Sequence, residues 1–428
     1  MSDVTRRNFL SFLAGSPLLA AAGVDLTSLR RLIGGSLREQ EAALDAVQQA
    51  TQDSLIAQAR EALNVFDFEP VARRKLPPAH WAYMATGTDD DATIRANREG
   101  FTRYTLRVRR LVDVSKIDTS IDLLGTKWAT PIVLCPVGSQ KAFHPEGEIA
   151  VARAAKARGH LQVLSTVGTT SYEDVSEARG MPVWFQLYHQ ADWNQTRHVV
   201  KRVEKAGCPV IALTIDQIGG GNRETMRRGA MLDDRRCEQC HAGGRPEPGV
   251  SGRVDDRDNR RKPMLAEPGP GTPIPEVGTP TWEFVRRLKN TTSMKIFLKG
   301  IVTREDAELA IQNGADGMFV SNHGGRAENS ERATIVALPE VVAGVRRRVP
   351  IIVDSGFRRG TDIFKGLALG ATAIGIGRPY VWGLAAFGQE GVETVLALLQ
   401  RELNIVMRQA GTVSVKHITP RYVVPRGA

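Results

Sequence analysis

The sequence lacks several features that would each assign it to a familiar class of protein. After the N-terminal residues, it contains no run long and apolar enough to span a bilayer. Its formal charge is +10, but the basic residues are scattered among Asp and Glu and form no dense run or known nucleic-acid-reading motif. We therefore expect no nucleic-acid partner, and a basic surface suits an acidic substrate or redox partner instead.

A Gly-rich dinucleotide fingerprint is also absent after the first predicted strand, so no NAD site is expected. Cysteine is scarce, with four in 428 residues. Cys135 and Cys208 lie in apolar stretches and are predicted to be core residues. Cys237 and Cys240 lie instead in a polar segment and are followed directly by His241. This second pair needs an explanation other than packing.

The N-terminal residues resemble an export signal. Arg6 and Arg7 precede a short, mildly apolar run that extends to about Ala22, as in twin-arginine signals. We interpret residues 1–22 as a signal of this type and expect a periplasmic protein. The alternative is an N-terminal helix whose two arginines are simply solvated.

Residues 23–75 are predicted to form a helical N-terminal extension. Leu29, Leu32, Ile33 and Leu37 recur at helical spacing among charged residues. Such a segment suits a packing or oligomer arm, and no chemistry is assigned to it.

From residue 76 to residue 428, short apolar runs alternate with helical stretches rich in Ala, Arg and Glu. Continuous apolar strands separated by helices indicate a parallel sheet covered on both faces. The number of such units favours a closed (β/α)8 TIM barrel, of the α/β class, over an open sheet. The predicted strands are 131–136, 161–165, 183–187, 210–214, 296–299, 318–321, 351–354 and 373–376.

The alternation is interrupted between residues 225 and 280. This segment is rich in Arg, Asp, Gly and Pro and has little apolar periodicity. We predict a long loop inserted after the fourth strand. Loops of this length inside a compact domain are usually functional.

Polar residues recur where the predicted strands end. In a (β/α)8 barrel the carboxyl ends of the strands meet at one face, which carries the active site. Together these residues therefore predict a pocket. They are Ser165, Gln186, Tyr188, Thr214, Asp216, Lys299, the segment 321–326, Asp354, Gly377 and Arg378.

Several of these residues lie in longer motifs. The motifs begin at Tyr83 (Tyr-Met-Ala-Thr-Gly), His144 (His-Pro-Glu-Gly-Glu), Gln186 (Gln-Leu-Tyr), Lys299 (Lys-Gly), Ser321 (Ser-Asn-His-Gly-Gly-Arg), Arg358 (Arg-Arg-Gly-Thr-Asp) and Ile376 (Ile-Gly-Arg-Pro). From about Leu76 to the C-terminal region, apart from the long loop, the chain resembles the FMN-dependent 2-hydroxy-acid dehydrogenase and oxidase family. That family includes glycolate oxidase and the lactate and mandelate dehydrogenases.

The resemblance implies an enzyme that oxidises a small 2-hydroxy acid. His323 is expected to be the base that takes the hydroxyl proton while hydride passes to flavin N5. Asp216 is expected to pair with the imidazole and stabilise its protonated form. A guanidinium binds both carboxylate oxygens at once, which suits two arginines as a clamp. The implied substrate site consists of Tyr83, Tyr188, Arg223 and Arg326.

The resemblance also implies an FMN site. Lys299 is expected near flavin N1, where it would stabilise the anionic reduced ring, and small polar side chains are expected to bond the flavin edge. Glycines let backbone N–H groups approach a phosphate while arginines balance its charge. The implied FMN site consists of Ser165, Gln186, Thr214, Lys299, Ser321, Asp354, Gly356, Arg358, Gly377 and Arg378.

Cys237, Cys240 and His241 have the spacing of a c-type haem attachment site. The two thiols would bind haem covalently, His241 would ligate the iron, and Met264 is a candidate second axial ligand. Such a haem would pass electrons from FMN to a soluble cytochrome. A loop disulfide and half of a zinc site are the alternatives for this motif.

Two other functions compete with a dehydrogenase. One is an oxidase that passes electrons to oxygen and forms peroxide, and the other is a barrel that only binds or transfers electrons. Retention of His323, Arg326, Tyr83 and Lys299 argues against an inactive barrel. Relatives are often oligomers, so a homo-oligomer is expected. The substrate's side chain stays undetermined, because Met84, Val167, Asn329 and the glycines before Arg223 depart from the family pattern.

Overall fold

The structure is a computed structural model that describes residues 55–217, 220–235, 262–265 and 278–427. The chain divides into two compact units, Met1–Glu61 and Ala62–Ala428. The predicted export signal and residues 23–54 of the predicted extension lie outside the described residues. In the first unit the described part ends in a short 3-10 helix, η1 (Ala59–Glu61). Across the described residues, no helix has the length and apolarity needed to cross a membrane.

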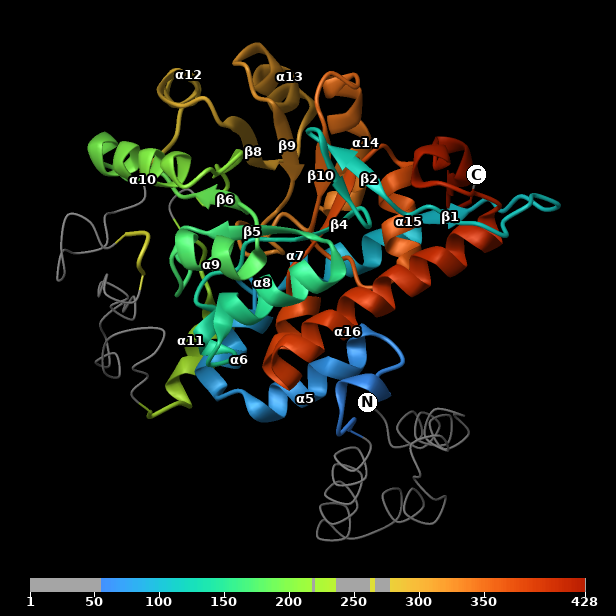
Figure 1. Cartoon of the computed structure of the whole chain (residues 1–428), viewed down its shortest axis with the longest axis horizontal. Helices are drawn as coiled ribbons and strands as arrows, with labels where there is room; N and C mark the ends of the chain where they lie inside the picture. Colours follow the sequence, from blue (N-terminus) through green and yellow to red (C-terminus); the bar gives the residue numbers. More distant parts are fainter. Residues whose placement is uncertain (1–54, 218–219, 236–261, 266–277, 428) are drawn as a thin grey trace, which may run out of the picture. The chain divides into compact units, whose positions relative to one another are not determined.

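The second unit confirms the predicted (β/α)8 barrel. Its parallel strands close in the order β10-β11-β4-β5-β6-β7-β8-β9, and Figure 1 shows helices packed around them. Each predicted apolar run contains or overlaps one barrel strand. The strands are β4 (Ile132–Leu134), β5 (Leu161–Ser165), β6 (Trp184–Leu187), β7 (Val210–Thr214), β8 (Lys295–Ile301), β9 (Gly317–Val320), β10 (Ile351–Val353) and β11 (Ala373–Ile376).

The strands are mostly apolar because both of their faces are covered. All residues of β5 and β7, for example, are buried. One face points into the barrel and the other packs against the helices. These helices are α8 (Gly147–Arg158), α9 (Tyr172–Arg179), α10 (Trp193–Lys205), α12 (Trp282–Thr291), α13 (Arg304–Gln312), α14 (Thr334–Val345), α15 (Gly360–Ala368) and α16 (Arg378–Ala410).

The compact unit that contains the barrel also includes the last residues of the predicted N-terminal extension. The compact unit already begins at Ala62, because α5 (Phe68–Lys75) packs against α16 and buries Phe68, Val71 and Ala72. Two further helices precede the barrel, α6 (Pro78–Ala85) and α7 (Ala92–Glu99).

Two small antiparallel sheets were not predicted. The first pairs β1 (Tyr104–Leu106) with β12 (Val423–Pro425), so that the start and the end of the barrel unit lie side by side. The second is formed by β2 (Ile121–Leu123) and β3 (Thr126–Trp128). Three-residue strands give little sequence signal, and the β1–β12 pair depends on a contact between distant parts of the chain.

The predicted loop after the fourth strand also needs a correction. It does follow β7, but its first residues form a helix, α11 (Glu224–Met231), which packs against α6. Residues 262–265 are buried or half-buried against the barrel unit. The remainder of the segment up to residue 277 lies outside the described residues.

A buried carboxylate joins two of the loops at the carboxyl ends of the strands. Glu148, at the start of α8, is 0% exposed. Its oxygens accept hydrogen bonds from the backbone N–H of Thr169 (2.8 Å) and from the hydroxyls of Thr169 (2.7 Å) and Thr170 (2.9 Å). The side chain therefore fixes the loop after β5 to the helix that follows β4.

We predict that Glu148→Ala lowers the free energy of unfolding by about 3 kcal/mol, because three or more buried donors lose their acceptor. Denaturant unfolding followed by circular dichroism measures the change. Glu146→Ala is the matched control: this side chain is 46% exposed and pairs only with the exposed Arg153. Equal stability of the two variants would contradict the assignment.

Candidate active site

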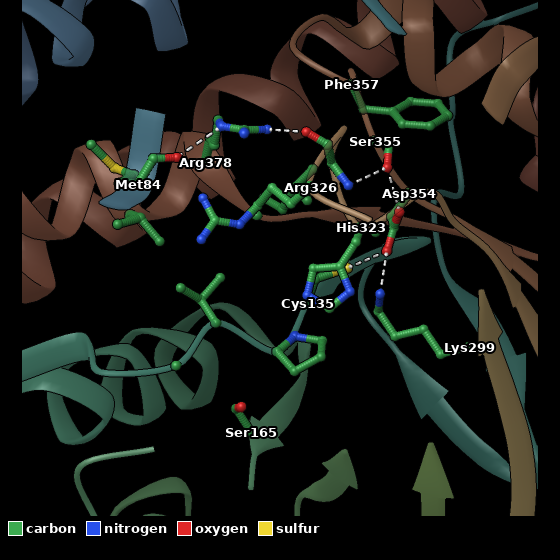
Figure 2. Close-up of a pocket in the computed structure, with 18 of the residues that line it drawn as sticks. Met84, Cys135, Ser165, Lys299, His323, Arg326, Asp354, Ser355, Phe357 and Arg378 are labelled. Atoms are coloured by element: carbon green, nitrogen blue, oxygen red, sulfur yellow. Dashed lines mark hydrogen bonds and ion pairs between the residues drawn. The ribbon is translucent and has the colours of Figure 1, made fainter. Parts of the chain in front are cut away.

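The cavity at the carboxyl ends of the barrel strands brings together most of the predicted site residues (Figure 2). Four others stand directly behind its wall: Gln186, Thr214, Asp216 and Ser321. The predicted residues that line the cavity are Tyr83, Ser165, Tyr188, Arg223, Lys299, His323, Arg326, Asp354, Gly356, Arg358, Gly377 and Arg378.

His323 and Asp216 form a hydrogen-bonded pair. His323 Nδ1 lies 2.9 Å from Asp216 Oδ1, and the two side chains are 19% and 8% exposed. Because a carboxylate accepts, Nδ1 carries the proton and Nε2 is left as the basic nitrogen. The backbone of His323 has a φ of +58°, a conformation that costs energy outside glycine and is typical of functional sites.

Burial and neighbouring charges act on both groups of this pair. Burial lowers the pKa of His323 and outweighs the opposite effect of Asp216, while Lys299 lowers it further. Burial alone would raise the pKa of Asp216, but His323 and Lys299 reverse this effect and leave it below the ordinary value. At neutral pH the pair is therefore a neutral imidazole held by a carboxylate.

Tyr188 follows β6 and contacts the same imidazole. Its hydroxyl lies 3.2 Å from His323 Nε2, and the two rings are nearly parallel with centroids 6.4 Å apart. Burial raises the pKa of Tyr188 well above the ordinary value, so its hydroxyl remains a donor at neutral pH. The basic nitrogen of His323 thus faces a hydroxyl on the cavity wall.

Lys299 is a buried cation at the end of β8. Its Nζ donates to Ser321 Oγ over 2.9 Å and lies 3.7 Å from Asp354 Oδ2. Burial alone would lower the pKa of Lys299, but Asp354 and Asp216 outweigh it and raise the pKa. Figure 2 shows Lys299 and Cys135 converging on Asp354. The lysine is therefore charged and faces the cavity.

Three side chains from neighbouring strands form a polar ladder behind the cavity wall. Ser165 Oγ donates to Gln186 Oε1 over 3.0 Å, and Gln186 Nε2 donates to Thr214 Oγ1 over 2.9 Å. Ser165 is paired with Gln186 in the strand register, and all three side chains are buried. This ladder explains why only Ser165 reaches the cavity surface.

Arg326 and Tyr83 form a second group on the cavity wall. The Arg326 guanidinium donates to the carbonyl oxygens of Tyr83 and Thr86 and lies 4.9 Å from the centre of the Tyr83 ring. Burial, with help from nearby Arg223, lowers the pKa of Arg326 to about 9, so it is charged at neutral pH. Arg223, the residue that directly precedes α11, lines the same cavity.

Arg358 and Arg378 form a further cationic group, in which Arg358 is buried and Arg378 is half-buried. Burial lowers the pKa of Arg358 to about 10 and that of Arg378 to about 9. Neither guanidinium forms an ion pair with a carboxylate of the described residues. Gly356 has a φ of +88°, and Gly377 directly precedes the first turn of α16, which exposes backbone N–H groups. Two cations that are buried or half-buried beside such backbone call for an anion.

Sequence reasoning missed two residues that shape this site. Ser355 has a φ of +73°, accepts from Gly324 N–H over 3.0 Å and donates to Asp354 Oδ1 over 2.7 Å. Lys262 is 1% exposed and donates to Ser139 Oγ and to Val167 O. For Ser355, the available sequence signal was a polar residue directly after Asp354, at the end of a predicted strand. No local pattern distinguishes Lys262 from the surrounding basic residues.

The predicted haem motif is not placed by the structure, since Cys237, Cys240 and His241 lie outside the described residues. Met264 is described. Its sulfur is buried and lies 3.2 Å from the backbone N–H of Tyr172. The role of Met264 as a second axial ligand stays a prediction.

Comparison with known proteins matches residues 72–425 to the FMN-dependent dehydrogenase family. The chain is 39% identical over 376 residues to glycolate oxidase 1 of Oryza sativa subsp. indica, covering 85% of this chain and 96% of the relative. Glycolate oxidase of Spinacia oleracea is 38% identical with the same coverage. Among solved structures, a mandelate oxidase superposes with a TM-score of 0.74 and 36% identity, covering 85% of this chain and 98% of that chain.

We predict that Asp216→Asn lowers the pKa of His323 further, because the anion that stabilises the protonated imidazole is lost. Ring-proton NMR titration measures the shift, with the His323 signal identified by its loss in His323→Gln. His160, whose pKa burial lowers to about 4, serves as an internal control and should titrate alike in both proteins. A raised or unchanged His323 pKa would show that the pair is not electrostatically coupled.

Proposed function

Because the chain belongs to the FMN-dependent 2-hydroxy-acid dehydrogenase and oxidase family, we propose that it oxidises a small L-2-hydroxy acid to the 2-oxo acid. The observation that carries this proposal is the position of His323. Its basic Nε2 faces a cavity also lined by the half-buried cation Arg326, while Nδ1 is bound to Asp216. A base beside a cationic group is what deprotonation of a hydroxy acid needs.

The residues of the cavity fit FMN. Arg358, Arg378 and the backbone at Gly356 and Gly377 supply the cations and N–H groups that a phosphate needs. Ser165 and Lys299 supply a hydroxyl and a cation for the edge of the flavin ring. When bound there, FMN would accept the hydride that leaves the substrate carbon, and with it both electrons of the oxidation.

The base in this reaction is His323. Nε2 takes the proton of the substrate hydroxyl, and the carboxylate of Asp216 stabilises the imidazolium that forms. The Tyr188 hydroxyl, 3.2 Å from Nε2, orients the substrate oxygen against the base. The low pKa of His323 keeps the imidazole neutral, and thus able to accept the proton, in the free enzyme at neutral pH.

The substrate carboxylate is held by Arg326 and Arg223, with the Tyr83 hydroxyl as an additional donor. Guanidinium groups bind carboxylate oxygens by two parallel hydrogen bonds and thereby fix the orientation of C2. Lys299 acts on the flavin and not on the substrate carboxylate. Its buried charge favours the accumulation of negative charge on the reduced flavin ring.

The electron acceptor is assigned to a haem held by Cys237, Cys240 and His241, which passes electrons to a soluble cytochrome. The Cys-x-x-Cys-His spacing and the twin-arginine signal support this assignment together, since this haem is attached outside the cytoplasm. The proposal therefore includes export to the periplasm, and a homo-oligomer as in many relatives.

A second candidate is an oxidase that reduces oxygen to peroxide. The names of the relatives favour it, because glycolate oxidases and a mandelate oxidase are among the similar proteins. The two candidates share the first half of the reaction and differ only in how the reduced flavin is reoxidised.

We predict that His323→Ala lowers kcat by about a thousandfold or more while FMN stays bound, because the base is lost but the FMN-binding side chains remain. Steady-state turnover of lactate, glycolate and mandelate, together with the flavin spectrum, measures both effects. His417→Ala, at an exposed position, is the control and should retain activity. Turnover close to that of the unmodified enzyme would refute the proposed mechanism.

The proposed haem acceptor is tested by producing the chain, with its predicted export signal, in a host that attaches haem. Visible spectra of the protein from the periplasm are then recorded. We predict reduced-haem peaks that grow after addition of a 2-hydroxy acid. Cys237→Ala with Cys240→Ala should abolish these peaks and leave substrate bleaching of the flavin intact. A flavin spectrum without haem, and peroxide formed in proportion to substrate, would replace the haem assignment by the oxidase.

A further inference from the structure

Helices α6 and α11 approach each other closely at one point. A Cβ atom added at Gly229 of α11 would lie 2.4 Å from Cβ of Ala82 of α6, and 3.3 Å from the carbonyl oxygen of Pro78. Carbon atoms in contact are normally separated by about 3.5–4.0 Å. Even an alanine at position 229 would therefore move the two helices apart.

Hydrogen bonds also join the start of α11 and the residue Asn222 before it to the loop that follows α6. Asn222 exchanges two hydrogen bonds with Asp89, through Asp89 N–H (2.7 Å) and Asn222 Nδ2 (3.0 Å). Thr225 Oγ1 donates to Asp91 Oδ1 over 3.3 Å. Residues 222–225 thus lie along the loop that follows α6.

The other end of α11 is fastened in the same way. The carboxylate of Asp233 accepts from Ala79 N–H over 3.2 Å and so caps the first turn of α6, whose preceding residue Pro77 supplies no side-chain cap. Side-chain burial contributes little to the position of α11, because none of its residues is buried. The contacts with residues 79–91 are therefore what places this helix.

Both segments carry side chains that line the cavity. Tyr83 follows Ala82 on α6, and Arg223 directly precedes α11. We propose that α6 and α11 act together as a carboxylate clamp, defined as residues 78–91 and 222–233, and that Gly229 is its positioning residue. The absence of a side chain at Gly229 sets the spacing that brings Arg223 to the substrate carboxylate beside Tyr83.

This proposal rests on the proposed function and deepens it. A carboxylate held equally well before and during the reaction contributes to substrate binding, so moving Arg223 outward raises KM and leaves kcat largely unchanged. Arg378, one of the two cations placed at the FMN phosphate, donates to the carbonyl oxygens of Met84 and Thr86 within the clamp segments. A shift confined to α11 leaves these contacts in place, so FMN retention should not change.

The experiment adds a methyl group on α11 and removes one from the facing position of α6. Gly229→Ala introduces the clash, and Ala82→Gly in the same chain removes it. We expect Gly229→Ala to raise KM for the 2-hydroxy acid about tenfold, the cost of a displacement on the order of 1 Å. The double variant Gly229→Ala with Ala82→Gly should regain most of the lost affinity. Ala82→Gly alone is the control for the cost of a glycine in α6.

A second comparison tests whether Gly229 acts through Arg223. In a chain that already carries Arg223→Met, Gly229→Ala should raise KM no further. If Gly229 acted independently of Arg223, the fold-increases in KM of the two substitutions would multiply in the double variant. The clamp is overturned if KM is unchanged in Gly229→Ala, if the effects multiply, or if FMN is lost and Ala82→Gly does not restore it. The activity of the unmodified enzyme is measured before any variant is made. If that enzyme oxidises no 2-hydroxy acid, the proposed function itself is refuted.

Discussion

Lys299, Asp216 and His323 are charged or titratable groups held where little water reaches them, and their mutual placement constrains the whole site. A buried imidazole keeps its orientation and its basic nitrogen only if a carboxylate holds the other nitrogen, here at 2.9 Å. A buried carboxylate in turn needs a cation nearby, which Lys299 supplies from the next strand. The barrel satisfies this requirement because neighbouring parallel strands end at the same face.

The cavity also concentrates positive charge that the described chain does not balance. Arg358 is buried and Arg326 and Arg378 are half-buried, all without an ion pair to a described carboxylate. Arg223 lines the same cavity. A phosphate and a substrate carboxylate are the two anions that this arrangement accommodates. Charge balance is thus consistent with the proposal that one cavity binds both the FMN phosphate and the carboxylate of the substrate.

The barrel strands and most of the site were predictable because their signals are local. Runs such as 161–165 and 210–214 are mostly apolar, and each ends in a polar residue, Ser165 or Thr214. Other features depend on contacts between distant segments. Pairing of Tyr104–Leu106 with Val423–Pro425, the packing of α5 on α16 and the burial of Lys262 all arise in this way. The helix α11 was missed because its stability comes from α6 rather than from an apolar face of its own.

The central claim is that this site removes hydride from C2 of a 2-hydroxy acid while His323 takes the hydroxyl proton. The most direct test mixes the FMN-loaded enzyme rapidly with lactate, and separately with lactate deuterated at C2, in the absence of oxygen. The account predicts that the flavin absorbance bleaches and that deuterium slows this bleaching several-fold. A flavin that stays oxidised with lactate, glycolate and mandelate alike would contradict the account.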